Sequence, residues 1–134
     1  MLTGRFGDTT GAPYLEGRLA IPRLNVEGNV SFLADTGADE TALMPDDANL
    51  LNVDFSMLGN TTQVLGVGGA TGAFHEPAVV AFTDPGKCVY YYSVLLWISA
   101  PTRNHVGIPT LLGRNILDRW RMVYEPSKDR LTFT

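Results

Sequence analysis

Glycine and proline recur along the whole of this chain, and their spacing limits it to short structural elements. Fourteen glycines and eight prolines fall among 134 residues. Both residues destabilise the interior of a helix, and clusters of them mark turns. The segments between them are rich in the β-branched and aromatic residues that favour strands. The main strand candidates are Tyr14–Pro22, Asn29–Ala34, Gln63–Val67, Ala73–Phe82 and Val89–Ile98, the last expected to be buried on both faces. The pattern predicts an all-β fold.

The C-terminal half adds two turns and one helix to this prediction. Asp84–Lys87 carries the residues of a tight turn. Pro126–Asp129 separates Met122–Tyr124 from Arg130–Phe133, which predicts a terminal hairpin. Between these features, Arg114–Trp120 has the apolar spacing of a short helix with one buried side.

Length and charge narrow the functional classes. A chain of 134 residues fits a single domain spanning 1–134 with one core. Its net charge of −4 disfavours nucleic-acid binding, which needs a dense basic face. The N-terminus lacks a signal-like apolar segment, and the longest apolar stretch is too short to cross a bilayer. Cys88 is the single cysteine, so no intrachain disulfide can form. We therefore expect a cytoplasmic protein without nucleic-acid or membrane partners.

The segment with the strongest chemical signal begins where an apolar strand ends. Asp35 follows Phe32-Leu33-Ala34 directly and is followed by Thr36, Gly37, Ala38 and Asp39. An ionised carboxylate near a buried strand needs hydrogen bonds or a partner charge. Thr36 offers a hydroxyl, and Gly37 allows close backbone approach. Asp, Thr and Gly are also ordinary turn residues, but the flanking apolar run makes the whole string less common by chance.

Two strings of this chain resemble the signatures of the retropepsin-like, or retroviral-type, aspartic proteases. Leu33–Asp39 is similar to their two apolar residues followed by Asp-Thr/Ser-Gly-Ala and an acidic residue. Thr110–Leu117 resembles their apolar-apolar-Gly motif and C-terminal helix. In that family the Arg after this glycine pairs with the last Asp of the first string. The resemblance therefore implies an ion pair between Arg114 and Asp39.

A third string lies between these two, in the order that the family requires. The glycine-rich stretch from Leu65 to Gly72 resembles the flap, a β-hairpin that closes over bound peptide. A phosphate-binding loop fits poorly, because the third glycine of G-x-G-x-x-G would fall at Thr71. A merely flexible loop stays open as an alternative. The residues that the resemblance assigns to substrate binding are Ala38, Asp39, Leu65, Gly66, Val67, Gly68 and Gly69.

The resemblance implies both a fold and an activity. The fold would be a single-domain acid-protease barrel with a flap and one short C-terminal helix, closer to cellular and bacterial members than to viral ones. The activity would be that of an aspartic endopeptidase, a peptide hydrolase whose water is activated between two Asp35 carboxylates. One chain offers one Asp-Thr-Gly, so the active form would be a two-fold homodimer. Asp35, Thr36 and Gly37 would form each half of the catalytic site, without metal or cofactor. Arg5 is the only early candidate for the cross-dimer arginine of viral enzymes.

A different class of function also fits the sequence. A catalytically silent barrel of the same kind could serve as a peptide-binding or dimerisation module, although the intact Asp-Thr-Gly favours the enzyme.

Other reactive or aromatic side chains show no catalytic spacing. Cys88 is expected to be a core thiol, and His75 a surface imidazole beside the flap. Tyr90–Tyr92 and Trp97 are expected to pack in the core or an interface, because few basic residues accompany them. His105 lies in a loop and suggests no function.

Overall fold

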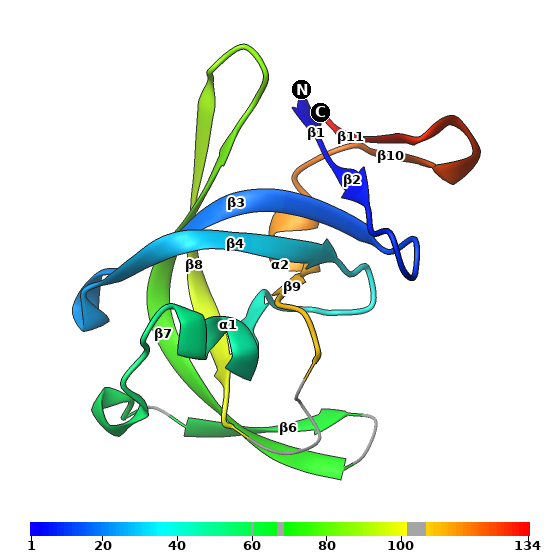
Figure 1. Ribbon diagram of the computed structural model, residues 1–134. Coiled ribbons are helices and arrows are strands. Elements are labelled where there is room, and N and C mark those ends of the chain that lie inside the picture. Colours follow the sequence, from blue (N-terminus) through cyan, green and yellow to red (C-terminus); the bar gives the residue numbers. More distant parts are fainter. Residues whose placement is uncertain (60, 67–68, 102–106) are drawn as a thin grey trace.

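The computed structural model describes residues 1–59, 61–66, 69–101 and 107–134, and it consists mainly of β-strands (Figure 1). The strands are β1 (Leu2–Thr3), β2 (Arg5–Phe6), β3 (Pro13–Ile21), β4 (Val26–Ala34), β5 (Ala42–Leu43), β6 (Thr61–Gly66), β7 (Gly69–Thr83), β8 (Val89–Ser99), β9 (Leu111–Leu112), β10 (Met122–Glu125) and β11 (Arg130–Phe133). The helices are α1 (Pro45–Leu50) and α2 (Arg114–Leu117), with 3-10 turns η1 (Pro22–Leu24), η2 (Phe55–Met57) and η4 (Pro126–Lys128).

Six strands close into a barrel. Within the described residues, one sheet has the order β2-β3-β4-β9-β5-β8-β7-β6, and β3 also pairs with β7. This extra pairing joins β3, β4, β9, β5, β8 and β7 into a ring. The β4–β9 and β5–β8 pairs are parallel, while the other pairs of the ring are antiparallel. The β6–β7 hairpin extends beyond the ring at the lower end of Figure 1.

Alternating side chains of the long strands fill the barrel. Val30, Phe32 and Ala34 of β4 are buried, whereas the residues between them are partly exposed. Phe32 meets Phe82 of β7 edge to face, with ring centroids 5.7 Å apart. The interior also holds a carboxylate, because the side chain of Glu76 is only 2% exposed. Arg23 of η1 compensates this charge by donating from Nε to Oε2 at 2.9 Å.

A second sheet joins the two ends of the chain beside the barrel. Its order is β1-β11-β10, and Arg121 and Thr134 exchange two backbone hydrogen bonds at its end. Trp120, just after α2, packs against Phe82 and Phe133 between this sheet and the barrel. Its indole Nε1 donates to the hydroxyl of Tyr92 at 2.6 Å.

Several sequence expectations about β8 and α2 need correction. The first half of β8 is mostly exposed rather than buried on both faces, and Tyr91 is 70% exposed. The end of the β7–β8 hairpin that contains this half projects beyond the barrel (Figure 1), which leaves its side chains exposed. Cys88 lies at the same end and is exposed, not a core thiol. The C-terminal helix is shorter than expected and ends at Leu117. The expected terminal hairpin is present as β10 and β11.

Candidate active site

Asp35 stands at the end of a parallel strand pair. The amide of Leu33 donates to the carbonyl of Thr110 at 2.8 Å, and that of Asp35 to the carbonyl of Leu112 at 3.0 Å. The ladder between β4 and β9 therefore continues to Asp35. Since side chains alternate along a strand, Asp35 lies on the same face as Leu33, opposite the core face that carries Ala34. The result is a partly exposed carboxylate on a rigid backbone.

A tight turn follows and holds this carboxylate. The amide of Gly37 donates to Oδ1 of Asp35 at 2.9 Å, and the amide of Ala38 donates to the carbonyl of Asp35 at 3.1 Å. A Cβ on Gly37 would lie 3.1 Å from the same Oδ1, so a side chain there would crowd the carboxylate. Thr36 and Gly37 are both exposed. The turn thus presents Asp35 toward solvent with one oxygen already oriented.

Arg114 joins this turn to the start of α2. Its guanidinium forms an ion pair with Asp39, and its Nη1 donates to the carbonyl of Thr36 at 2.8 Å. Its backbone amide donates to the carbonyl of Ala38 at 2.8 Å. The Asp39 and Arg114 side chains are 79% and 43% exposed, so the ion pair itself contributes little to the stability of the fold. Its effect is to fix the path of the turn.

A buried hydrogen-bond hub supports the same turn from beneath, and sequence reasoning missed it. Oδ1 of Asn115 accepts from the amide and the hydroxyl of Thr41, at 3.1 Å and 2.8 Å. The hydroxyl oxygen of Thr41 accepts in turn from the amide of Gly113 at 3.1 Å. A Cβ on Gly113 would lie 2.4 Å from the carbonyl carbon of Glu40, so only glycine fits there. Asn115 belongs to the second motif string and Thr41 follows the first by two residues, and this closeness was the available signal.

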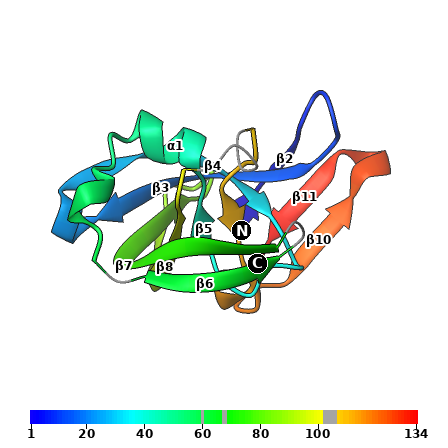
Figure 2. The same ribbon diagram turned by 90° about the horizontal axis from the view of Figure 1, so that it is seen from below.

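The glycine-rich stretch forms the end of a hairpin. Leu65 pairs with Ala70, and Gly66 at the end of β6 pairs with Gly69 at the start of β7. Val67 and Gly68 lie outside the described residues. Seen from below, the hairpin crosses the end of the molecule nearest the viewer (Figure 2). Both views place the paired ends of β6 and β7 at Gly66 and Gly69, the loop after β4 and the β10–β11 hairpin on the same side of the barrel.

The remaining candidates lie away from this centre or have other partners. Arg5 donates from Nε to Glu16 at 3.0 Å and lies over the ring of Tyr14, so it is engaged within its own chain. The expectation of a surface imidazole at His75 is wrong, because its ring is partly buried against Trp97. His105 lies outside the described residues.

The described residues contain no candidate metal site. They hold no group of three or more His, Cys, Asp or Glu side chains that could bind a metal ion. No helix among them is both long and apolar enough to cross a membrane.

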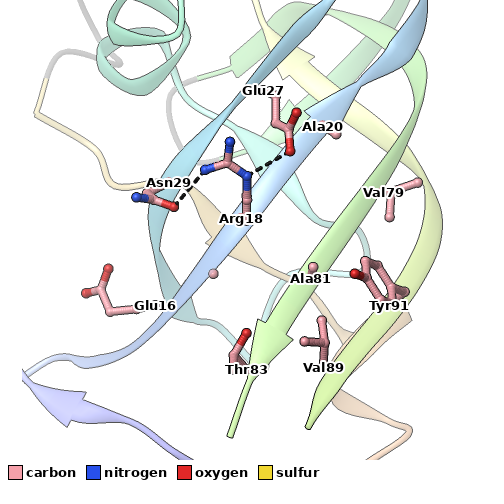
Figure 3. A pocket seen from close by; sticks show the side chains of 11 residues that line it. Glu16, Arg18, Ala20, Glu27, Asn29, Val79, Ala81, Thr83, Val89 and Tyr91 are labelled. Atoms are coloured by element: carbon pink, nitrogen blue, oxygen red, sulfur yellow. Dashed lines mark hydrogen bonds and ion pairs between the residues drawn. The ribbon is translucent and has the colours of Figure 1, made fainter. Parts of the chain in front are cut away.

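A surface depression of about 600 Å³ lies on the outer wall of the barrel, between β3, β4, β7 and β8 (Figure 3). The Arg18 guanidinium in this depression is already bound by its neighbours, because it donates to Glu27 at 2.8 Å and to Asn29 at 3.2 Å. Asp35 is not among its lining residues.

Comparison with known proteins supports the fold directly. No known family model and no curated protein matches this chain. Among solved structures, a retropepsin-like aspartic protease from Rickettsia conorii matches over 99% of this chain and 88% of its own. The TM-score is 0.65 and the sequence identity is 20%. The chain therefore has the retropepsin-like fold, as its sequence motifs predicted.

Proposed function

We propose that this chain is one half of an aspartic endopeptidase, active as a homodimer. The observation that carries the proposal is the position of Asp35. A carboxylate ends a strand of a retropepsin-like barrel, and a turn tied down by Arg114 presents it to solvent. Such preorganisation suits catalysis, because the reacting group needs no reorganisation when substrate binds.

The chemistry explains why a second copy is needed. Two carboxylates within a few ångströms cannot both ionise easily, so they share one proton and titrate as a pair. One takes a proton from a water molecule as it attacks the peptide carbonyl, and the other donates a proton to the developing oxyanion. This chain contains a single Asp-Thr-Gly. A two-fold axis beside Thr36 would supply the second Asp35 in an equivalent position.

Three elements are placed suitably for such a dimer. The loop of Asp35, the paired ends of β6 and β7, and the β10–β11 hairpin project to one side of the barrel. In the dimer, Gly37, Ala38 and Asp39 would form the floor of the cleft. The segment from Leu65 to Gly69 would form its roof. An extended peptide would bind between them through backbone hydrogen bonds and alternating side-chain contacts. The single cysteine suits a reducing compartment such as the cytoplasm.

One observation favours the catalytically silent module as the second candidate. All three strands of the terminal sheet β1-β11-β10 come from one chain, so this sheet needs no strand from a partner to form. A stable monomer could use the same surface to bind peptides without cleaving them.

A cleavage assay on a denatured protein and a peptide library tests the proposal. Wild type should cleave in a dimer-dependent manner, while Asp35→Asn, which preserves shape, should be inactive. Asp47→Asn on α1 makes the same change of charge away from the site and should keep full activity. A mixture of equal amounts of wild type and Asp35→Asn should have about a quarter of the activity of wild type at the same total protein concentration. Random pairing gives only about a quarter of the dimers two intact carboxylates, and both subunits must carry one.

Full activity of Asp35→Asn would contradict the proposal. A chain that stays monomeric in sedimentation at high concentration and cleaves nothing would favour the silent module.

A further inference from the structure

Five strands of the barrel bring one side chain each into a single transverse row. Leu33 on β4 pairs with Leu111 on β9, and Leu111 pairs with Ala42 on β5. Ala42 then pairs with Trp97 on β8, and Trp97 pairs with His75 on β7. Directly paired residues point to the same face of a sheet, so these five side chains share one face. All five are partly buried.

This face is also the face of the candidate catalytic carboxylate. Asp35 follows Leu33 by two positions on the same ladder, and their neighbours Phe32 and Ala34 point into the core. The row therefore runs from the side of Asp35 across the sheet to His75. Neighbouring strands lie about 4.8 Å apart, so Trp97 is three spacings, or about 14 Å, from Leu33 along the sheet. An extended peptide covers that distance in about four residues.

His75 is an unexpected residue at the end of this row. Its ring packs against Trp97 with centroids 4.4 Å apart, and its Nε2 is buried without a hydrogen-bond partner among the described residues. An unpartnered buried nitrogen costs free energy that a phenylalanine ring in the same place would avoid. The stability of the fold therefore does not explain an imidazole at this position.

We propose that His75, supported by Trp97, is a specificity-determining residue that recognises tyrosine in the substrate. The tyrosine would lie three or four residues from the scissile bond. Its ring would pack beside Trp97, and its hydroxyl would donate to Nε2. This inference rests on the proposed peptidase function. The β6–β7 hairpin pairs from Thr61 and Phe74 onward, so its backbone begins directly beside His75. Because Nε2 is buried in the free chain, peptide binding would have to expose it for this hydrogen bond to form.

The test compares peptide pairs that differ only in Tyr or Phe at the third and fourth residues on either side of the cleaved bond. Wild type should cleave the Tyr peptide about tenfold better in kcat/KM at one of these positions, the effect of one hydrogen bond. His75→Phe should remove this preference and leave the Phe peptide within about twofold. His75→Gln, which keeps a hydrogen-bonding group, should retain part of it. Tyr91→Phe, on the exposed end of β8, is the matched control and should change nothing.

Three results would overturn the inference. They are equal cleavage of Tyr and Phe peptides by wild type, an unchanged preference in His75→Phe, or an equal loss for both peptides in that variant. A thermal scan separates misfolding from loss of specificity, because His75→Phe should melt no lower than wild type.

A measurement without cleavage keeps the outcome separate from the proposed function. Adding the Tyr peptide to the Asp35→Asn variant should shift the imidazole NMR signals of His75, whereas the Phe peptide should shift them less. Equal or absent shifts would refute the role of His75 even if the enzyme proves active.

Discussion

The hub of Thr41, Asn115 and Gly113 allows one quantitative prediction about both stability and activity. Replacing Thr41 by valine keeps the shape of a fully buried side chain and removes its hydroxyl. The amide of Gly113 then loses its acceptor, and Oδ1 of Asn115 loses one of its two donors. Both partners remain in place, so the variant reports on hydrogen bonding rather than on a cavity.

The magnitude follows from these two losses. A buried donor left without an acceptor costs about 1–3 kcal/mol, and the weakened bond to Asn115 adds about 1 kcal/mol. We therefore expect Thr41→Val to destabilise the fold by about 3 kcal/mol. An unfolding entropy of about 2.1 cal/mol/K per residue gives about 280 cal/mol/K for 134 residues. The melting temperature should thus fall by about 10 °C.

Chemical and thermal unfolding of the isolated subunit measure this change, and Thr132→Val supplies the control. Thr132 on β11 is partly exposed, and no side-chain hydrogen bond is found for it within the described residues, so its replacement should stay within about 0.5 kcal/mol. Peptide cleavage should fall with Thr41→Val even at temperatures where the variant is folded, because the hub supports the turn of Asp35. A loss below about 1 kcal/mol would refute the view that these bonds are buried and essential.

Three further predictions concern single positions around the barrel. Gly113→Ala should destabilise the fold by about 2 kcal/mol or more in denaturant titration, because its Cβ would overlap the backbone of Glu40. Arg114→Met should lower the melting temperature only slightly yet reduce cleavage about tenfold or more, because the exposed ion pair positions the turn rather than stabilising the fold. The hydrogen bond from the amide of Cys88 holds the pKa of Asp84 below its ordinary value of 3.8, so this carboxylate stabilises the fold above that value. The stability difference between wild type and Asp84→Asn should be constant near neutral pH and disappear as pH falls through the lowered pKa, and a pH-independent difference would contradict this.

Sequence reasoning reached the fold because the informative strings are local. The run ending at Asp35 combines an apolar strand with a turn, and both follow from neighbouring residues. The same holds for the terminal hairpin, where Pro126 and Asp129 flank the turn between β10 and β11. Each of these features needs only a few consecutive positions to be recognised.

The missed features depend on contacts between distant segments. Thr41 and Asn115 are 74 residues apart, and Arg23 and Glu76 are 53 apart. Glu76 appears in an ordinary strand pattern, and nothing beside it in the sequence signals that Arg23 will neutralise it in the core. The exposure of Cys88 was missed for a related reason, because an apolar strand looks the same whether or not a second layer covers it.

The contacts that position Asp35 do not depend on the proposed second copy of the chain. Every group described around Asp35 comes from its own chain, as do all three strands of the terminal sheet. The single chain can therefore hold its carboxylate in position without a second copy. In the proposed dimer, the second copy would then have to supply only its own carboxylate and the other half of the cleft. It follows that Asp35→Asn should abolish cleavage without loss of subunit stability, whereas Thr41→Val should weaken both.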